Sequence, residues 1–233
     1  MGDSDSALIL ALHLAFTGDD QLYGIIGLSL QVSLLATAIA TILGLPLAAL
    51  LAILRFPGRG AVVTALNALL GLPPVVVGLF VYLALSRAGP LGSLGLLFTP
   101  TAMVIAQTIL ITPIVCAIAL RSLEDFNAEY TEQLRAFGLT ARERSLTLLY
   151  EARFSMATAV LAGFGRAVAE VGAVMIVGGN IAGVTRVMTT AIALETSKGD
   201  LPLALALGLV LMAIVLAVNA LAQGLRERGL RLA

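Results

Sequence analysis

Few residues in this sequence could serve as redox, metal-binding or catalytic groups. The 233 residues include one cysteine, one histidine and no tryptophan, and only 12% of them are charged. Cys116 stands alone in an apolar run, which excludes an intrachain disulfide and a cysteine metal cluster. His13 also stands alone, beside a short apolar stretch, and we interpret it as an interfacial side chain. The sequence therefore predicts no metal site.

Nucleotide-binding motifs are missing as well. A phosphate-binding loop reads G-x-x-x-x-G-K-[S/T], but Lys198 is the only lysine and no serine or threonine follows it. Gly163-x-Gly165 is not a dinucleotide fingerprint, because Val168 occupies the place of the third glycine. The hydrolase patterns H-E-x-x-H and G-x-S-x-G are absent too. We expect a chain that does not itself hydrolyse ATP and is not a membrane enzyme.

Apolar residues are present in excess. They make up 59% of the chain, and the mean hydropathy is +1.02, whereas a soluble domain averages about 45–50% apolar residues. A membrane-crossing helix needs about 20 mostly apolar residues. This length predicts an all-α integral membrane protein with five spans, placed at Ile25–Leu51, Gly60–Ser86, Leu96–Leu120, Phe154–Ile181 and Leu201–Leu225.

The basic residues predict how the spans are oriented. Arginine and lysine favour the cytoplasmic side of a membrane, so we place the segment 121–153 in the cytoplasm. The outer side then holds only Arg87, Arg186 and Lys198, while Arg166 lies within a span. The expected cytoplasmic set is Arg55, Arg59, Arg121, Arg135, Arg142, Arg144, Arg153, Arg226, Arg228 and Arg231. Ten residues against three predict an outer N-terminus and a cytoplasmic C-terminus.

The first 20 residues are expected to form an external or interfacial segment ahead of a transmembrane domain over residues 21–233. The apolar stretch Ala7–Phe16 is too short to cross a membrane. The N-terminus carries Asp3 and Asp5 in place of a basic region, so we expect no cleaved signal peptide. A sixth span through Ala7–Phe16 is the alternative.

Several spans contain polar residues or prolines. Small hydroxyl residues recur every four positions on the first span, and such stripes let helices approach closely in lipid; they are Ser29, Ser33, Thr37 and Thr41. We favour packing over a pathway for this stripe. Pro73–Pro74 and Pro113 are expected to interrupt the second and third spans, because proline removes a helical hydrogen bond. These features favour a bundle with an interior.

The cytoplasmic segment 121–153 predicts two short helices joined by an elbow. The first is expected over Glu129–Phe137, with Gly138 as its left-handed cap. Thr140-Ala141-Arg142-Glu143 fits a capping box that would begin a second helix at Ala141. The segment exposes leucines among its charges, which favours a docking surface over a solvated connector; they are Leu139, Leu146, Leu148 and Leu149.

The fourth span carries two charges, Arg166 and Glu170. Each would cost about 2.5–3.5 kcal/mol at the centre of a lipid-facing helix. Their spacing places them on one helix face, but with the arginine first the order is less favourable for a local ion pair. We therefore expect them also to reach neighbouring helices or a second subunit, with Gln107, Thr108 and Asn219 as candidate partners. Two roles stay open, a buried brace and a positive group along a pathway for a dianion.

The cytoplasmic elbow is the first part of the sequence that resembles a known family. The segment resembles the signature loop of importer permeases of the ABC transporter superfamily, which reads E-A-A, three residues, Gly, about nine residues and an I-x-L-P-like ending. EQL at 132–134 stands in the E-A-A place, Gly138 in the Gly place, and LL at 148–149 near the apolar ending. Both alanines are replaced, and YE at 150–151 stands where proline is common. The resemblance implies a coupling helix that docks on an ATPase through Glu132, Gly138, Leu139, Thr140, Arg142, Glu143 and Leu146.

The C-terminal half resembles the oxyanion importer permeases of the molybdate, sulfate and tungstate group. The shared features are Arg166, a glutamate four residues later, a Gly-Ala pair and then Gly-Asn. Residues 184–200 resemble tungstate permeases most. Val187–Ser197 is moderately helical and is similar to the short outer gate helix before the last span, with a solvated loop as the alternative. The implied gate residues are Asn180, Arg186, Thr189, Thr190 and Glu195.

The resemblance implies an importer-type ABC permease bundle in a prokaryotic plasma or inner membrane. We expect a homodimer with two ATPase subunits and an external binding protein, importing a tetrahedral oxyanion. Tungstate is the expected substrate, with molybdate or sulfate as alternatives. An ATP-independent channel or a membrane enzyme is the alternative of a different class. The partner ATPase would use ATP and Mg. No cofactor in this chain and no nucleic-acid partner are expected.

Overall fold

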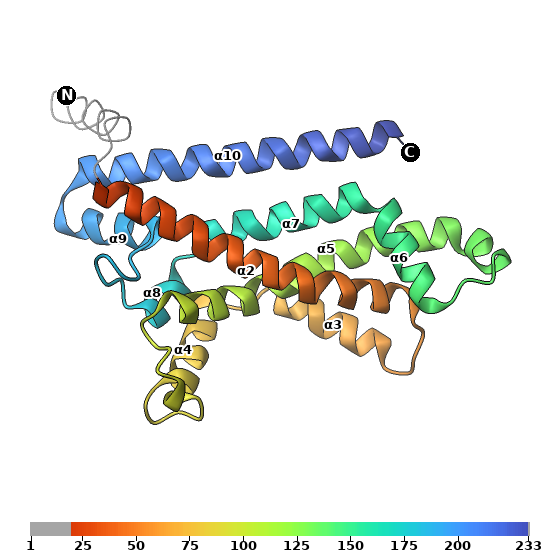
Figure 1. Ribbon diagram of the computed structural model, residues 1–233, viewed down its shortest axis with the longest axis horizontal. Coiled ribbons are helices and arrows are strands. Elements are labelled where there is room, and N and C mark those ends of the chain that lie inside the picture. Colours follow the sequence, from red (N-terminus) through yellow and green to blue (C-terminus); the bar gives the residue numbers. More distant parts are fainter. Residues whose placement is uncertain (1–19, 233) are drawn as a thin grey trace. The chain divides into compact units, whose positions relative to one another are not determined.

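The computed structural model describes residues 20–232 (Figure 1). The side chains at 20, 131–135, 141, 145, 226 and 229–232 are outside this description. His13 and the expected interfacial stretch Ala7–Phe16, with the six-span alternative that depends on it, also lie outside the described residues. The side chain of Glu132, expected at the ATPase contact, is not described either.

The described chain is helical throughout, with no strand among its residues, so the all-α prediction is confirmed. The helices are α2 (Asp20–Ile53), α3 (Arg59–Leu69), α4 (Pro74–Leu85), the short 3-10 turn η1 (Gly92–Leu94), α5 (Pro100–Ala136), α6 (Ala141–Glu151), α7 (Arg153–Val168), α8 (Gly172–Gly178), α9 (Met188–Lys198) and α10 (Leu201–Leu232).

Three stretches are long and apolar enough to cross a membrane as single helices, namely Leu22–Ile53, Pro100–Tyr130 and Leu201–Leu225. Two bent helix pairs raise the number of candidate spans to five if each pair is one span. The helices of the pair α3 and α4 are bent by 99°, and those of α7 and α8 by 58°. The chain is thus a multi-pass membrane protein, and each of the expected second and fourth spans is a bent helix pair rather than one continuous helix.

The prolines explain only one of these features. Pro73 caps α4 and Pro74 is its first residue, where a missing N–H costs nothing, so the expected interruption is confirmed there. Pro113 lies inside continuous α5, so the interruption expected at that residue is wrong. Membrane helices tolerate proline where neighbouring groups satisfy the freed carbonyl.

The segment 121–153, which we expect in the cytoplasm, differs from its predicted form in one respect. The expected separate helix over Glu129–Phe137 is instead the end of α5, which runs without a break to Ala136. The reason is visible in residues 121–136, which include neither glycine nor proline. The helix expected over Val187–Ser197 is confirmed as α9.

The chain forms two compact units, each built from segments far apart in sequence. The first unit contains Pro73–Gln107, Arg166–Ala217 and the described chain up to Ala36. In it α4 packs against α8, as Figure 1 shows. The contact is close because Gly78 has no side chain: a Cβ there would lie 2.8 Å from the Cα of Ala173.

The second unit contains Thr37–Leu72, Thr108–Gly165 and Val218–Ala233. Its core joins the end of α2 to α5, α6 and the start of α7 through fully buried residues such as Ala48, Leu123, Leu148 and Ala159. Small residues dominate this core, which lets the helices approach closely as membrane helices do. The elbow after α5 is therefore anchored to the spans by packing.

Candidate functional site

The intramembrane charges form a direct ion pair in the first unit. Arg166 lies on the last turn of α7, and its Nη1 is 2.5 Å from Oε2 of Glu170. Glu170 follows the end of α7, in the break before α8, so the two residues do not share a continuous helix face as predicted. The expectation that residue order would disfavour a local pair is also wrong, because that rule applies to residues within a helix.

Glu170 connects three helices. Its Oε1 accepts a hydrogen bond from the Ala173 N–H at 3.0 Å, in the first turn of α8, where a negative charge is favourable. Its backbone carbonyl accepts the Thr189 hydroxyl of α9 at 2.7 Å. The Glu170 side chain is 4% exposed, against 37% for Arg166. Glu170 is thus fixed on several sides, whereas the guanidinium of Arg166 keeps part of its surface open.

The surroundings of Glu170 are polar and tightly filled. Gln107 donates from Nε2 to the Ala167 carbonyl at 3.0 Å, while its buried Oε1 has no partner among the described residues. With Ser29 and Ser33, these groups line a cavity of about 10 Å³. Such a volume is at the lower limit for one water molecule. In this structure the described residues around Glu170 leave room for about one water molecule at most.

Another candidate partner of the pair, Thr108, is not bonded to it. The Thr108 hydroxyl is buried without a partner in the described part of the chain. Gln107 meets the α7 backbone rather than the charges themselves. Gln107 therefore lines the same cavity as Glu170, but its described bond is to Ala167 and not to either charge as predicted.

The segment before α9 is held by hydroxyl groups. The Thr185 hydroxyl donates to the Gly178 carbonyl at 2.5 Å and accepts from the Ile181 N–H at 3.0 Å. Asn180, with a positive φ of 51°, donates from Nδ2 to the Thr190 carbonyl at 3.3 Å. The Met188 N–H donates to the Ser29 hydroxyl of α2 at 2.7 Å. Ser29 therefore serves helix packing, as predicted, and Thr185 is a structural residue that sequence reasoning missed.

The five gate candidates divide into groups. Thr189 joins the Glu170 cluster, and Asn180 and Thr190 contact each other. Arg186 and Glu195 line a separate cavity of about 20 Å³ with Leu22 and other apolar residues. Lys198 donates to Glu195 at 3.0 Å, so that buried carboxylate is partnered within α9.

The elbow between α5 and α6 has the predicted chemistry. Gly138 has a φ of +65°, the left-handed conformation expected of a helix C-cap. The Thr140 hydroxyl accepts from the Glu143 N–H at 3.3 Å, and the Glu143 carboxylate accepts from the Thr140 N–H at 2.8 Å. Hydrogen bonds from the Thr140 side chain and then its backbone lower the pKa of Glu143. The capping box and the start of α6 at Ala141 are therefore confirmed.

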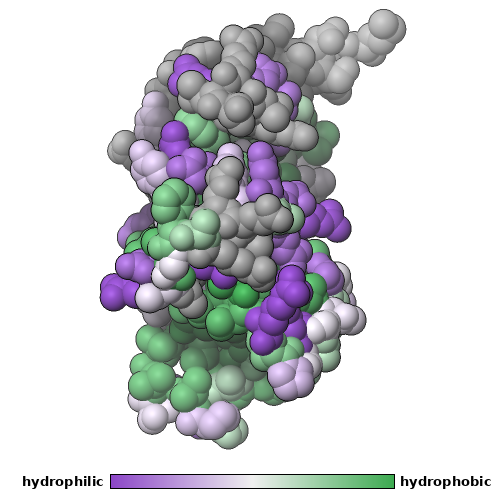
Figure 2. All heavy atoms as spheres, turned by 90° about the vertical axis from the view of Figure 1, so that its right-hand side faces the viewer, coloured by the Kyte–Doolittle hydropathy of each residue, from purple (hydrophilic) through white to green (hydrophobic). Residues whose placement is uncertain are grey.

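The leucines of the elbow do not all face outward as expected. Leu148 is only 1% exposed and belongs to the core of the second unit, with Leu139 and Leu149 packed against it. Leu146 is 58% exposed, Phe137 and Tyr150 are exposed as well, and so is Arg142. Figure 2, which faces the side where Figure 1 shows α6, has hydrophilic and hydrophobic residues next to one another.

A hydrogen-bonded network joins α6 to the spans of the second unit. Arg144 donates to Asn127 Oδ1 at 3.0 Å, and Asn127 Nδ2 donates to the Ala52 carbonyl at the end of α2 at 3.3 Å. Arg59 pairs with Glu124 of α5 and donates from Nε to the Leu51 carbonyl at 2.7 Å. Sequence reasoning missed this network, because its partners lie up to 75 residues apart and form no local motif.

Comparison with known proteins identifies several relatives of this chain. A probable anion ABC transporter permease of Haloferax volcanii is 42% identical over 89% of this chain and 91% of its own length. The tungstate uptake permease TupB of Peptoclostridium acidaminophilum is 42% identical over 93% of this chain and 95% of its own. TupB of Campylobacter jejuni is 44% identical over 68% of this chain and 66% of its own.

The family assignment depends on these relatives alone, because a scan against protein-family models found no match. Identity above 40% over more than nine-tenths of two relatives covers the bent helix pairs, the elbow and the Glu170 cluster together. The chain therefore belongs to the ABC transporter permease family, in the oxyanion group that includes the tungstate uptake permeases.

Proposed function

We propose that this chain is the membrane-spanning subunit of an ATP-driven tungstate importer. The observation that carries the proposal is the 42% identity to a tungstate uptake permease over 95% of that protein's length. A partly exposed arginine beside a braced glutamate suits the passage of a dianion, since it offers positive potential without making a deep trap. Molybdate and sulfate are the alternative substrates within the same group.

The chain would work as a homodimer with two ATPase subunits and an external binding protein. The α5–α6 elbow supports the ATPase contact, since it presents Phe137, Leu146 and Tyr150 as exposed apolar groups. ATP and Mg would be used by the ATPase partner, and this chain would hold no cofactor. The coupling helix is α6, positioned by Gly138 and the Thr140 capping box.

Of the two roles considered for the charge pair, the buried brace belongs to Glu170 and the positive group along the pathway to Arg166. Glu170 is the brace, because its carboxylate and carbonyl are engaged by α7, α8 and α9. Arg166 is the residue that faces the anion, because its side chain is the more exposed of the two. Thr189 then links the state of α9, the outer gate helix, to the position of Glu170.

The proposed topology has an outer N-terminus, five crossings and a cytoplasmic C-terminus. Its support is the ten-to-three distribution of basic residues across the expected sides. With this topology the α5–α6 elbow faces the ATPase and α9 faces the external binding protein.

Reconstitution tests the function directly. The permease, the ATPase and the binding protein encoded beside it would be assembled in proteoliposomes, and uptake of tungstate, molybdate and sulfate measured by mass spectrometry with and without ATP. Uptake of tungstate that requires ATP, with weak competition by the other two anions, is expected. Preference for sulfate or molybdate would reassign the substrate, and uptake without ATP would indicate a channel.

A further inference from the structure

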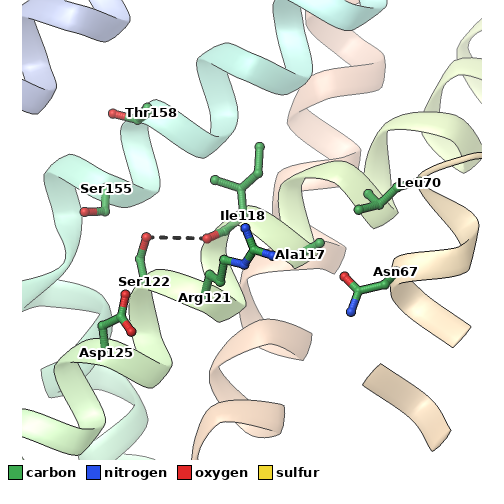
Figure 3. Close-up of a pocket in the computed structure, with 9 residues that line it drawn as sticks. All are labelled: Asn67, Leu70, Ala117, Ile118, Arg121, Ser122, Asp125, Ser155 and Thr158. Atoms are coloured by element: carbon green, nitrogen blue, oxygen red, sulfur yellow. Dashed lines mark hydrogen bonds between the residues drawn. The ribbon is translucent and has the colours of Figure 1, made fainter. Parts of the chain in front are cut away.

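A cavity of the second unit lies between α3, α5 and α7. Its volume is about 520 Å³, within the range of about 300–1,000 Å³ that is usual for ligand sites. Six polar side chains line it: Asn67 of α3, Arg121, Ser122 and Asp125 of α5, and Ser155 and Thr158 of α7. Figure 3 shows them around the space, with the Arg121 guanidinium lying between the Asp125 side and the Asn67 side.

Most of these polar groups are not engaged by the protein. The hydroxyls of Ser122 and Thr158 donate to carbonyls of their own helices, at 3.4 and 3.0 Å. The side chains of Arg121, Asp125 and Asn67 make no hydrogen bond or ion pair with any residue that the structure describes, and the same holds for the Ser155 side chain. The cavity thus presents an unpaired guanidinium together with polar groups that can still accept or donate.

The position in the chain makes this arrangement informative. Arg121 directly follows the expected third span, Leu96–Leu120, at the end of α5 that we place on the cytoplasmic side, and its side chain and that of Asp125 are exposed. Basic residues favour this side of a membrane, where they remain charged in contact with water. The polar lining of three helices around Arg121 is therefore expected to hold water and solutes.

We propose that this cavity is a binding site for a tetrahedral dianion, with Arg121 as its principal contact. The planar guanidinium can bind two oxygens of such an anion at once. Asp125, one helical turn further, opposes tight binding, which permits the release that conduction requires. This inference rests on the proposed function, because it identifies the oxyanion class as the occupant. Arg121 would act on the side of the membrane that carries the α5–α6 elbow.

The test measures local potential and occupancy with a single cysteine at Ser155. In a Cys116→Ser background, Ser155→Cys would be labelled in the assembled, ATP-free transporter in inside-out vesicles, with an anionic and a cationic methanethiosulfonate reagent of similar size. Labelling faster with the anionic reagent is expected. Arg121→Gln should lower the anionic-to-cationic rate ratio about fivefold, Asp125→Asn should raise it, and Arg121→Lys should largely restore it.

Separate measurements test whether the anion occupies the cavity and whether the effect is specific to it. Tungstate at millimolar concentration should slow labelling with Arg121 present and not in Arg121→Gln. Arg228→Gln, an exposed residue of α10 outside the cavity lining, is the matched control and should leave the ratio unchanged. If the ratio follows the anionic lipid content of the vesicles and ignores soluble tungstate, the occupant is a lipid headgroup and the proposal is overturned.

Two further outcomes would also overturn the inference. Equal rates for both reagents in all variants would mean that Arg121 sets no local potential. A cysteine at 155 that neither reagent reaches would mean that the cavity is closed in the assembled transporter. Co-elution of each variant with the ATPase checks folding. ATP-driven uptake is measured on the same vesicles, so failure of the proposed function is seen separately from failure of the site.

Discussion

The Thr189 hydroxyl donates a hydrogen bond to the backbone carbonyl of Glu170 at 2.7 Å, and both residues are buried. The bond joins the first turn of α9 to the break between α7 and α8. Glu170 itself pairs with Arg166, so the helix proposed as the outer gate and the intramembrane ion pair share one residue. A movement of α9 would therefore shift Glu170 and change its ion pair with Arg166.

Removing the Thr189 hydroxyl should destabilise this junction. Thr189→Val keeps the shape but leaves the Glu170 carbonyl without its donor, which costs about 1–3 kcal/mol for a buried group. We expect a lower thermal unfolding temperature of the purified complex and slower uptake. Thr189→Ser retains the hydroxyl and is the control. A Val variant as stable and active as the Ser variant would show that the bond contributes nothing.

Exchanging the charges of the ion pair should not restore function. In Arg166→Glu with Glu170→Arg, the pair could reform, but an arginine at 170 cannot accept from the Ala173 N–H and would place positive charge at the start of α8. We expect the double variant to transport no better than Glu170→Gln. Complex assembly, followed by co-elution with the ATPase, separates lost transport from lost folding. Recovery of uptake in the double variant would show that the pair acts only as a local brace.

The residues tolerated at position 138 should be limited by backbone conformation and not by space. A Cβ at this position would meet no atom within 4 Å, but φ is +65°. The left-handed region costs a non-glycine residue about 1–2 kcal/mol, less for asparagine and more for β-branched residues. Uptake and stimulation of the ATPase by the loaded binding protein should fall in the order Gly, Asn, Ala, Val. Full activity of Gly138→Val would contradict the assignment of an obligatory elbow.

The bond between Arg144 and Asn127 should transmit the position of α6 to α2. Arg144→Ala and Asn127→Ala are expected to show a coupling energy of about 0.5–3 kcal/mol in a double-mutant cycle on thermal stability. The pairing of Asn127→Ala with Arg228→Ala should be additive and serves as the control. ATP hydrolysis should continue in Arg144→Ala with less anion moved per ATP. A fully additive cycle would show that the bond between Arg144 and Asn127 does not couple α6 to α2.

The proposed topology can be checked by labelling. In a Cys116→Ser background, a cysteine at Ser197, an exposed residue of α9, should react from outside in intact cells. A cysteine at Leu146, exposed on α6, should react only after permeabilisation. The same reagent and the same cells are used for both cysteine variants, so the labelling of each position is the control for the other. Outside labelling at 146 would reverse the orientation and the coupling assignment together.

Local chemistry in the sequence was sufficient to predict the helical class, the positions of three long spans, α9 and the elbow. Apolar runs of about 20 residues mark spans without reference to neighbours. The left-handed glycine and the capping box at Thr140 involve only residues within a few positions of each other. The same local reading was wrong at Pro113, because whether a helix bends at proline depends on what surrounds it.

Contacts between distant segments were decided only by the tertiary structure. The break that places Glu170 between α7 and α8 made the Arg166 pair local, and it also brought Thr189 to the Glu170 carbonyl. The bond from Asn127 to Ala52 and the cavity around Arg121 likewise need helices that are separated in sequence. Such polar groups carry no periodic pattern, because each is satisfied by one partner at one place in the fold, and only the packed chain shows which partner that is.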